Sequence, residues 1–212
     1  MSRDSRDSRD SQDDAPRIVG TRTVYEGWAR YLVAEVRMPD GSRIGREVED
    51  HGPAVAVLPY DRERRVALLV RQFRTPPCFV DGTASLLEAP AGLREEDDPE
   101  ACARREAFEE VGLRLSILEP AGRVWSLPGL STERMDLFLA PYRAVDREGA
   151  GGGLAEEHES IEVVEVALAT LAAEADAGAI ADMKTLCLLQ TLRLRHPDLF
   201  ADPSVATGRE QD

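Results

Sequence analysis

The feature that most limits the fold of this chain is a pair of unbroken apolar segments. Ala54–Leu58 and Val66–Val70 contain apolar residues only. A strand with one face in water alternates apolar and polar residues, whereas an unbroken run is expected for a strand that is buried. The chain is therefore expected to build a sheet that other elements cover.

Further elements follow these runs. Strands are predicted to begin at Ser85–Glu88 and to cover Leu113–Leu118, Met135–Leu139 and Ile161–Val166. Helices are predicted over Asp98–Val111, Leu168–Ala177 and Lys184–Arg195, the last two being ended by Gly178 and Pro197. Strands mixed with separated helices indicate an α/β or α+β fold in which helices cover the sheet.

The chain is expected to have four regions. Residues 1–16 form a low-complexity tail with repeated Ser-Arg-Asp, which is expected to be disordered. Residues 17–50 are interpreted as a small antiparallel sheet with a turn at Pro39-Asp40-Gly41. Residues 51–200 are expected to form the main domain, and 201–212 a loose C-terminal tail.

Composition limits the partners. The 212 residues carry a net charge of −14, which repels nucleic acid and anionic lipid, so neither is an expected partner. Cys78, Cys102 and Cys187 are widely spaced and odd in number, which fits a reducing cytoplasm better than a disulfide framework or zinc site. No apolar run reaches the roughly 20 residues that span a bilayer.

The helix predicted at Asp98–Val111 carries an unusual charge pattern. Glu106, Glu109 and Glu110 fall on one helical face, where they repel one another near the helix end that disfavours anions. Taken alone, such a cluster is most often a solvated acidic surface. A divalent cation, which prefers oxygen ligands, would also compensate the negative charge of these carboxylates.

The complete pattern favours the metal. Arg105-Glu106-Ala107-Phe108-Glu109-Glu110-Val111-Gly112-Leu113 matches every fixed position in the second half of the Nudix box, Gly-x5-Glu-x7-Arg-Glu-U-x-Glu-Glu-x-Gly-U, where U is aliphatic. The first half departs, with Ala91 at the Gly position and Asp97 at the first Glu. The chain thus resembles the Nudix hydrolase family. Motifs around it resemble the sugar-nucleotide branch of that family: Arg71-Gln72-Phe73-Arg74, Glu88–Leu93, Leu127-Pro128-Gly129 with Glu133, and Asp182–Thr185.

The resemblance implies an α/β/α sandwich around a mixed sheet, with an N-terminal sheet commonly exchanged within a homodimer. It also implies Mg²⁺, or alternatively Mn²⁺, as the cofactor. Glu106 and Glu110 are the expected ligands, with the Ala91 carbonyl as a further oxygen. Glu109 is either a ligand or is held by Arg105.

Other residues are expected to bind the substrate or supply a base. Arg suits bidentate phosphate binding, and the expected substrate contacts are Arg71, Arg74, Glu88 and Glu133. The segment Gly149–Ser160 is glycine-rich and then acidic, and is interpreted as a movable loop whose Glu159, or else Glu157, acts as the catalytic base.

The expected activity is metal-dependent hydrolysis of a nucleoside diphosphate sugar. The glycine-rich stretch and Lys184-Thr185 resemble the members of the family that act on GDP-mannose. This resemblance implies cleavage of GDP-mannose to GMP and mannose 1-phosphate, with ADP-ribose as the alternative. A catalytically silent sensing domain and a structural acidic protein are the rival classes, and the intact Glu cluster argues against the former.

Overall fold

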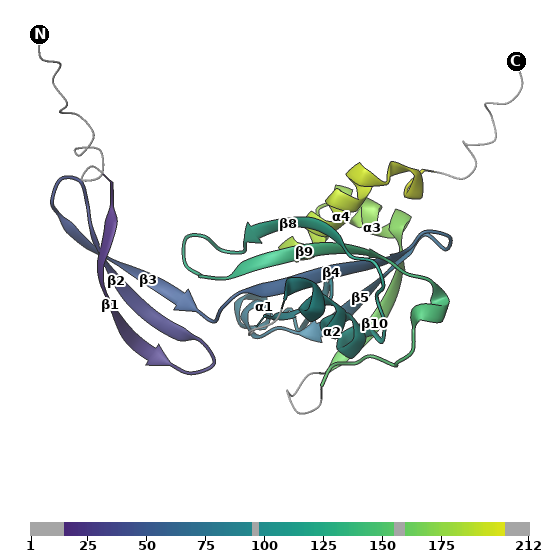
Figure 1. Ribbon diagram of the computed structural model, residues 1–212, viewed down its shortest axis with the longest axis horizontal. Coiled ribbons are helices and arrows are strands. Elements are labelled where there is room, and N and C mark those ends of the chain that lie inside the picture. Colours follow the sequence, from purple (N-terminus) through teal and green to yellow (C-terminus); the bar gives the residue numbers. More distant parts are fainter. Residues whose placement is uncertain (1–14, 95–97, 155–159, 202–212) are drawn as a thin grey trace, which may run out of the picture. The chain divides into compact units, whose positions relative to one another are not determined.

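A computed structural model describes residues 15–94, 98–154 and 160–201 (Figure 1). The chain separates into two compact units. The first contains residues up to Gly52 together with Leu127–Glu133, and the second contains Pro53–Ser126 and the chain from Arg134 onward.

The first unit is a three-stranded antiparallel sheet in the order β1-β2-β3. Its strands are β1 (Arg17–Glu26), β2 (Arg30–Arg37) and β3 (Arg43–Asp50). A tight turn joins β2 to β3, with Gly41 in the left-handed region at a φ of 82°. The small antiparallel sheet predicted from the sequence is confirmed.

The second unit contains a seven-stranded mixed sheet. Its main path runs β10-β5-β4-β9-β8, in which β4 and β9 are parallel and the other neighbours antiparallel. The strands on this path are β4 (Ala54–Asp61), β5 (Val66–Phe73), β8 (Glu119–Trp125), β9 (Arg134–Pro141) and β10 (Ile161–Ala167).

The strands β4 and β5, which contain the two unbroken apolar segments, diverge over most of their length. The segment that enters between them carries part of the candidate site described below. β4 and β5 pair only at Tyr60↔Ala67 and Asp61↔Val66. Beyond that point β6 (Ser85–Glu88) pairs with β5, and β7 (Ala91–Leu93) pairs with β4. The Val57 N–H also donates to the Pro90 carbonyl at 2.9 Å. Residues 85–93 therefore lie between β4 and β5 where these two strands are not paired.

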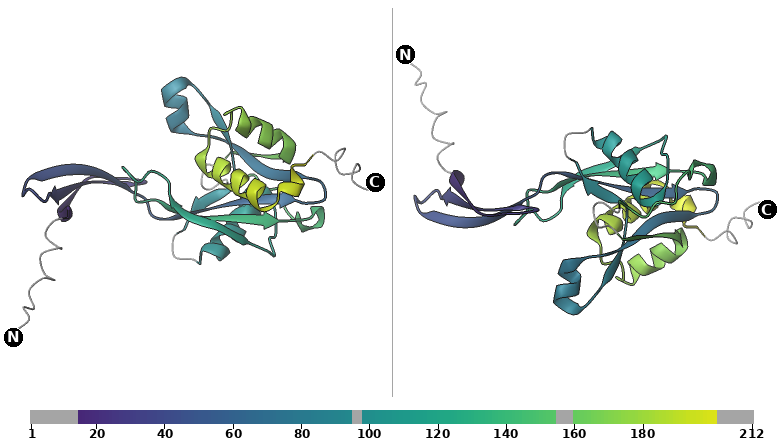
Figure 2. Two further views of the ribbon diagram at one scale, coloured as in Figure 1. Left: turned by 90° about the horizontal axis from the view of Figure 1, so that it is seen from above. Right: turned by 90° about the horizontal axis from the view of Figure 1, so that it is seen from below.

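Helices cover both faces of this sheet. Helix α2 (Pro99–Val111) lies on one face, and α3 (Leu168–Asp176) and α4 (Met183–Arg195) lie on the other (Figure 2). On β4, Val55 and Val57 pack with α2, while alternate residues, including Ala56 and Leu58, pack with α3 and α4. The unbroken apolar runs are explained by this two-sided burial, and the predicted helix-covered mixed sheet is confirmed.

Two details differ from the sequence-based expectation. Leu113–Leu118 is not a strand: apart from an isolated bridge at Leu113, pairing begins at β8, and the buried Leu113 and Leu115 pack irregularly against the α2 side of the core. Helix α1 (Thr75–Asp81) was not predicted, because its seven residues are too few to show a helical periodicity, and none of them is buried. Short 3-10 helices occur at Ala144–Asp146 and Pro197–Leu199. No helix within the described ranges has the length and apolarity to cross a membrane.

Candidate active site

The carboxylate-bearing helix α2 is defined by local signals at both ends. The Asp98 side chain accepts a hydrogen bond from the Ala101 N–H at 3.4 Å, and Pro99 occupies the first turn, where its missing N–H has no consequence. Gly112 ends the helix in the left-handed conformation, at a φ of 72°. These signals define where α2 begins and ends.

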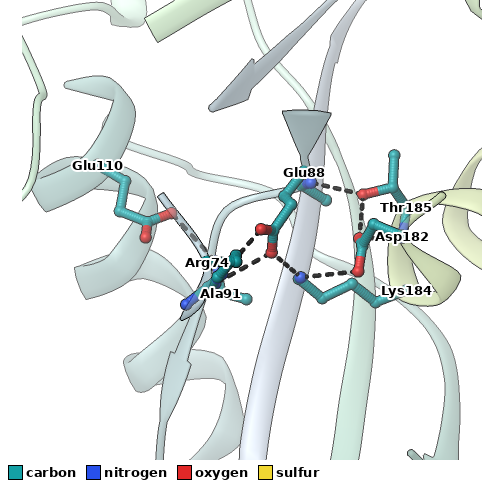
Figure 3. Close-up of polar contacts among 8 residues, drawn as sticks. Arg74, Glu88, Ala91, Glu110, Asp182, Lys184 and Thr185 are labelled. Atoms are coloured by element: carbon teal, nitrogen blue, oxygen red, sulfur yellow. Dashed lines mark hydrogen bonds and ion pairs between the residues drawn. The ribbon is translucent and has the colours of Figure 1, made fainter. Parts of the chain in front are cut away.

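Glu106 and Glu110, two of the three glutamates on one face of α2, are buried against the dipeptide Ala91-Gly92 of β7. The exposed fractions of Glu106 and Glu110 are 8% and 1%. The Ala91 N–H donates to Glu110 Oε2 at 3.1 Å (Figure 3), and a Cβ at Gly92 would lie 2.0 Å from Glu106 Oε1. The Glu106 carboxylate thus occupies the space of a side chain at position 92, and only glycine leaves room for it there.

Arg105 holds the third glutamate. Its guanidinium donates to Glu109 at 2.8 Å and lies 2.7 Å from Glu106. Burial opposes the charge of Arg105, but the carboxylates of Glu106 and Glu109 outweigh burial and raise its pKa. Contact with Arg105 is one of the two roles expected for Glu109.

A buried ion cluster lies beside this dipeptide. Glu88, only 2% exposed, accepts two hydrogen bonds from Arg74, at 2.8 and 3.0 Å, and one from Lys184 (Figure 3). Burial raises the pKa of Glu88, but Arg74 and Lys184 outweigh this and lower it. The Glu88 carboxylate therefore stays ionised at neutral pH.

The same cluster attaches α4 to the segment between the central strands. Asp182 caps α4 by accepting from the Thr185 N–H at 2.9 Å and from its hydroxyl at 2.5 Å, and it contacts Lys184 at 3.0 Å. Thr185 Oγ1 accepts from the Ala89 N–H at 2.6 Å. In the sequence, Asp182–Thr185 stands out only as a family pattern. Asp182 is recognisable as a helix cap, but the contact of Lys184 with Glu88 joins residues far apart in the chain and is not visible in the sequence.

The remaining predicted residues are dispersed. Arg71 lies 3.9 Å from Glu162 on the neighbouring strand β10, whereas Arg74 binds Glu88, so the two arginines have different partners. Glu133 belongs to the first compact unit. The base candidates Glu157 and Glu159, and Asp97 of the box, lie outside the described residues.

Within the first unit, Glu133 takes part in a network around His51. His51 lies 3.0 Å from Glu133 and 2.5 Å from Glu49, and Ser131 donates to Glu49 at 2.6 Å. Burial lowers the pKa of His51, but the two carboxylates outweigh it and raise the pKa. The network holds the segment Leu127–Glu133 to β3.

The donor set at Ala91-Gly92 suits a hard divalent cation. Within residues 15–94, 98–154 and 160–201, no three Asp, Glu, His or Cys side chains form a preassembled cage. Glu106 and Glu110 are nevertheless two carboxylates one helical turn apart, both buried, and they meet the backbone at Ala91. Burying two like charges together is unfavourable. Arg105 offsets part of this cost at Glu106, and a bound cation would offset more. Two carboxylates and the Ala91 carbonyl are oxygen ligands of the kind that Mg²⁺ and Mn²⁺ take.

Comparison with known proteins decides the family. The model of the NUDIX domain matches residues 50–184. The chain belongs to the Nudix family. This membership confirms the resemblance seen in the sequence around Arg105–Leu113.

Several curated relatives within the family carry one name. The GDP-mannose pyrophosphatase of Cronobacter sakazakii is 41% identical over 170 residues, covering 78% of this chain and 87% of the relative. The GDP-mannose pyrophosphatase of Klebsiella pneumoniae is 36% identical over 182 residues, covering 83% and 90%. A solved structure described as an ADP compounds hydrolase shares the fold, with a TM-score of 0.70 at 19% identity, covering 87% of this Nudix chain and 95% of that one.

Proposed function

We propose that this Nudix protein hydrolyses the diphosphate of GDP-mannose, giving GMP and mannose 1-phosphate, with Mg²⁺ as its metal and Mn²⁺ as a substitute. The observation that carries the chemistry is the burial of Glu106 and Glu110 against Ala91-Gly92. The name shared by the Cronobacter and Klebsiella relatives supports the choice of substrate.

Each group has a defined task in this proposal. Glu106, Glu110 and the Ala91 carbonyl would hold the metal, which when bound neutralises phosphoryl charge and lowers the pKa of a water molecule. Arg105 fixes the orientation of Glu109 and Glu106. Glu88 fixes Arg74 and Lys184 in place beside the metal ligands. The Arg74 side chain stays partly exposed, so its guanidinium can also bind a phosphate oxygen.

The remaining roles rest on the sequence. Arg71, Arg74, Glu88 and Glu133 are proposed to contact the substrate or to orient groups that do. Glu159, or else Glu157, is proposed to take the proton of the attacking water. The protein is further proposed to act as a homodimer in the cytoplasm.

A substrate panel tests this function. Release of nucleoside monophosphate is measured from GDP-mannose, ADP-ribose, UDP-glucose and diadenosine polyphosphates, with Mg²⁺ and with excess EDTA. GDP-mannose should give the highest kcat/KM, and EDTA should abolish turnover. A preference for ADP-ribose on the order of tenfold would reassign the substrate. No turnover of any compound would indicate a binding protein.

A further inference from the structure

The glycine-rich segment Gly149–Gly153 is bonded to the end of the carboxylate helix. The Gly152 N–H donates to the Glu110 carbonyl at 2.9 Å, and the Gly153 N–H donates to the Glu109 carbonyl at 3.1 Å. Just before them, the N–H groups of Glu148 and Gly149 both donate to the Gly112 carbonyl, at 2.9 and 3.1 Å. These bonds satisfy carbonyls that the last turn of a helix leaves without helical partners.

The close approach requires glycine at particular positions. Gly151 has a φ of 71°, and a Cβ there would lie 2.4 Å from the Glu110 carbonyl oxygen and 2.7 Å from the Val111 Cα. A Cβ at Gly112 would lie 2.1 Å from the Gly149 oxygen. Backbone atoms form both obstacles, so a side chain at either position would force the segment away from the helix.

The location of these bonds matters for the carboxylates. The C-terminal end of a helix carries partial negative charge, and α2 places Glu106, Glu109 and Glu110 in its last two turns. Backbone N–H groups directed at this end reduce the negative potential there. They also fix the last turn of α2, and with it the direction in which Glu106 and Glu110 reach Ala91-Gly92.

We propose that Gly149–Gly153 is a positioning segment for the metal-ligating carboxylates, acting through the backbone of the last turn of α2. This proposal rests on the metal-dependent function proposed above. The hydrogen bonds of Gly149–Gly153 give its glycines a role different from the loop mobility expected from the sequence. These glycines let backbone donors approach a helix end that any larger residue would block.

The chain supplies a closely matched pair of variants. Gly151→Ala and Gly178→Ala both place alanine in the left-handed region, at φ values of 71° and 70°. The new Cβ meets the Glu110 backbone in the first variant and has nothing within 4 Å in the second. Backbone strain is therefore shared, and only the contact with α2 differs.

Mn²⁺ binding to the substrate-free protein, measured by calorimetry, is the main readout, with Mg²⁺ activation of turnover as the second. Gly151→Ala should weaken Mn²⁺ binding by about tenfold, the usual size of an effect transmitted to a metal ligand by its supporting groups. It should raise the Mg²⁺ concentration for half-activation similarly, with little change in the KM for GDP-mannose. Gly178→Ala should leave both metal measurements within about twofold of wild type.

A milder variant covers the case in which Gly151→Ala does not fold. A Cβ at Gly149 would lie 3.3 Å from the Gly112 Cα, so Gly149→Ala requires only a small shift and should weaken Mn²⁺ binding by about threefold. Wild-type Mn²⁺ affinity in the folded glycine variants of this segment would overturn the inference, as would equal weakening in Gly178→Ala. Wild-type protein that neither binds Mn²⁺ nor hydrolyses GDP-mannose would overturn the proposed function, and the inference with it.

Discussion

At the scale of single residues, the buried Glu110 gives the most direct test of the metal site. Glu110→Gln keeps the side-chain volume and an oxygen that can accept from Ala91, so the protein should fold. Loss of the charge should lower kcat by about 10²–10⁴, as expected for an essential charge-stabilising group. Glu100→Gln, at an exposed position of the same helix, is the control and should retain activity. Full activity of Glu110→Gln, or wild-type turnover in EDTA, would contradict the assignment.

Gly92 gives a second residue-scale prediction, because Glu106 fills the space beside it. Gly92→Ala places a Cβ 2.0 Å from Glu106 Oε1, so the flexible carboxylate must turn away. Metal affinity should fall by about tenfold or more, since a ligand loses its geometry. Gly20→Ala, whose Cβ would meet only Glu35 at 4.0 Å, should bind Mn²⁺ like wild type. Unchanged Mn²⁺ binding by Gly92→Ala would place Glu106 outside the metal site.

At the scale of elements, the sequence predicts what local signals determine. Helix α2 is predictable because Asp98, Pro99 and Gly112 are local signals that mark its ends, and the spacing of its glutamates places them on one face. The spacing alone does not reveal that Glu106 and Glu110 are buried by β7. That burial depends on the divergence of β4 from β5, a long-range feature. The contacts of Thr185 with Ala89, and of the glycine segment with α2, are long-range for the same reason.

The cluster that joins α4 to β6 carries a prediction about stability. Glu88→Gln removes the buried partner of Arg74 and Lys184 and should lower the free energy of unfolding at pH 7 by about 3 kcal/mol. The folded-state pKa of Glu88 lies below its ordinary value of 4.5. Its stabilisation is therefore complete above pH 4.5 and is lost as pH falls through the folded pKa. In urea unfolding, the free energies of unfolding of wild type and Glu88→Gln should converge below pH 4.5. A difference that stays constant with pH would exclude the ionisation of Glu88 as the cause of the lost stability.

At the scale of the whole molecule, the first unit leaves large apolar side chains exposed, because a three-stranded sheet by itself is too small to bury them. Every residue of β1 is exposed, and Ile18, Tyr25 and Trp28 have exposed fractions of 64%, 60% and 77%. Exposed strands with apolar side chains commonly mark an interface. We therefore predict a homodimer at micromolar concentration, formed through this sheet.

Light scattering and sedimentation measure this assembly directly. Ile18→Glu should shift the protein towards monomer, because a charge placed in an apolar interface loses its hydration without a partner. Leu194→Glu changes an equally apolar side chain that is 83% exposed on α4, in the second unit, and should leave the dimer intact. Loss of turnover together with dissociation would show that the active site needs both subunits, and retained turnover would show that each subunit works alone. A fully active wild-type monomer at micromolar concentration would refute both the dimer and its role in the reaction.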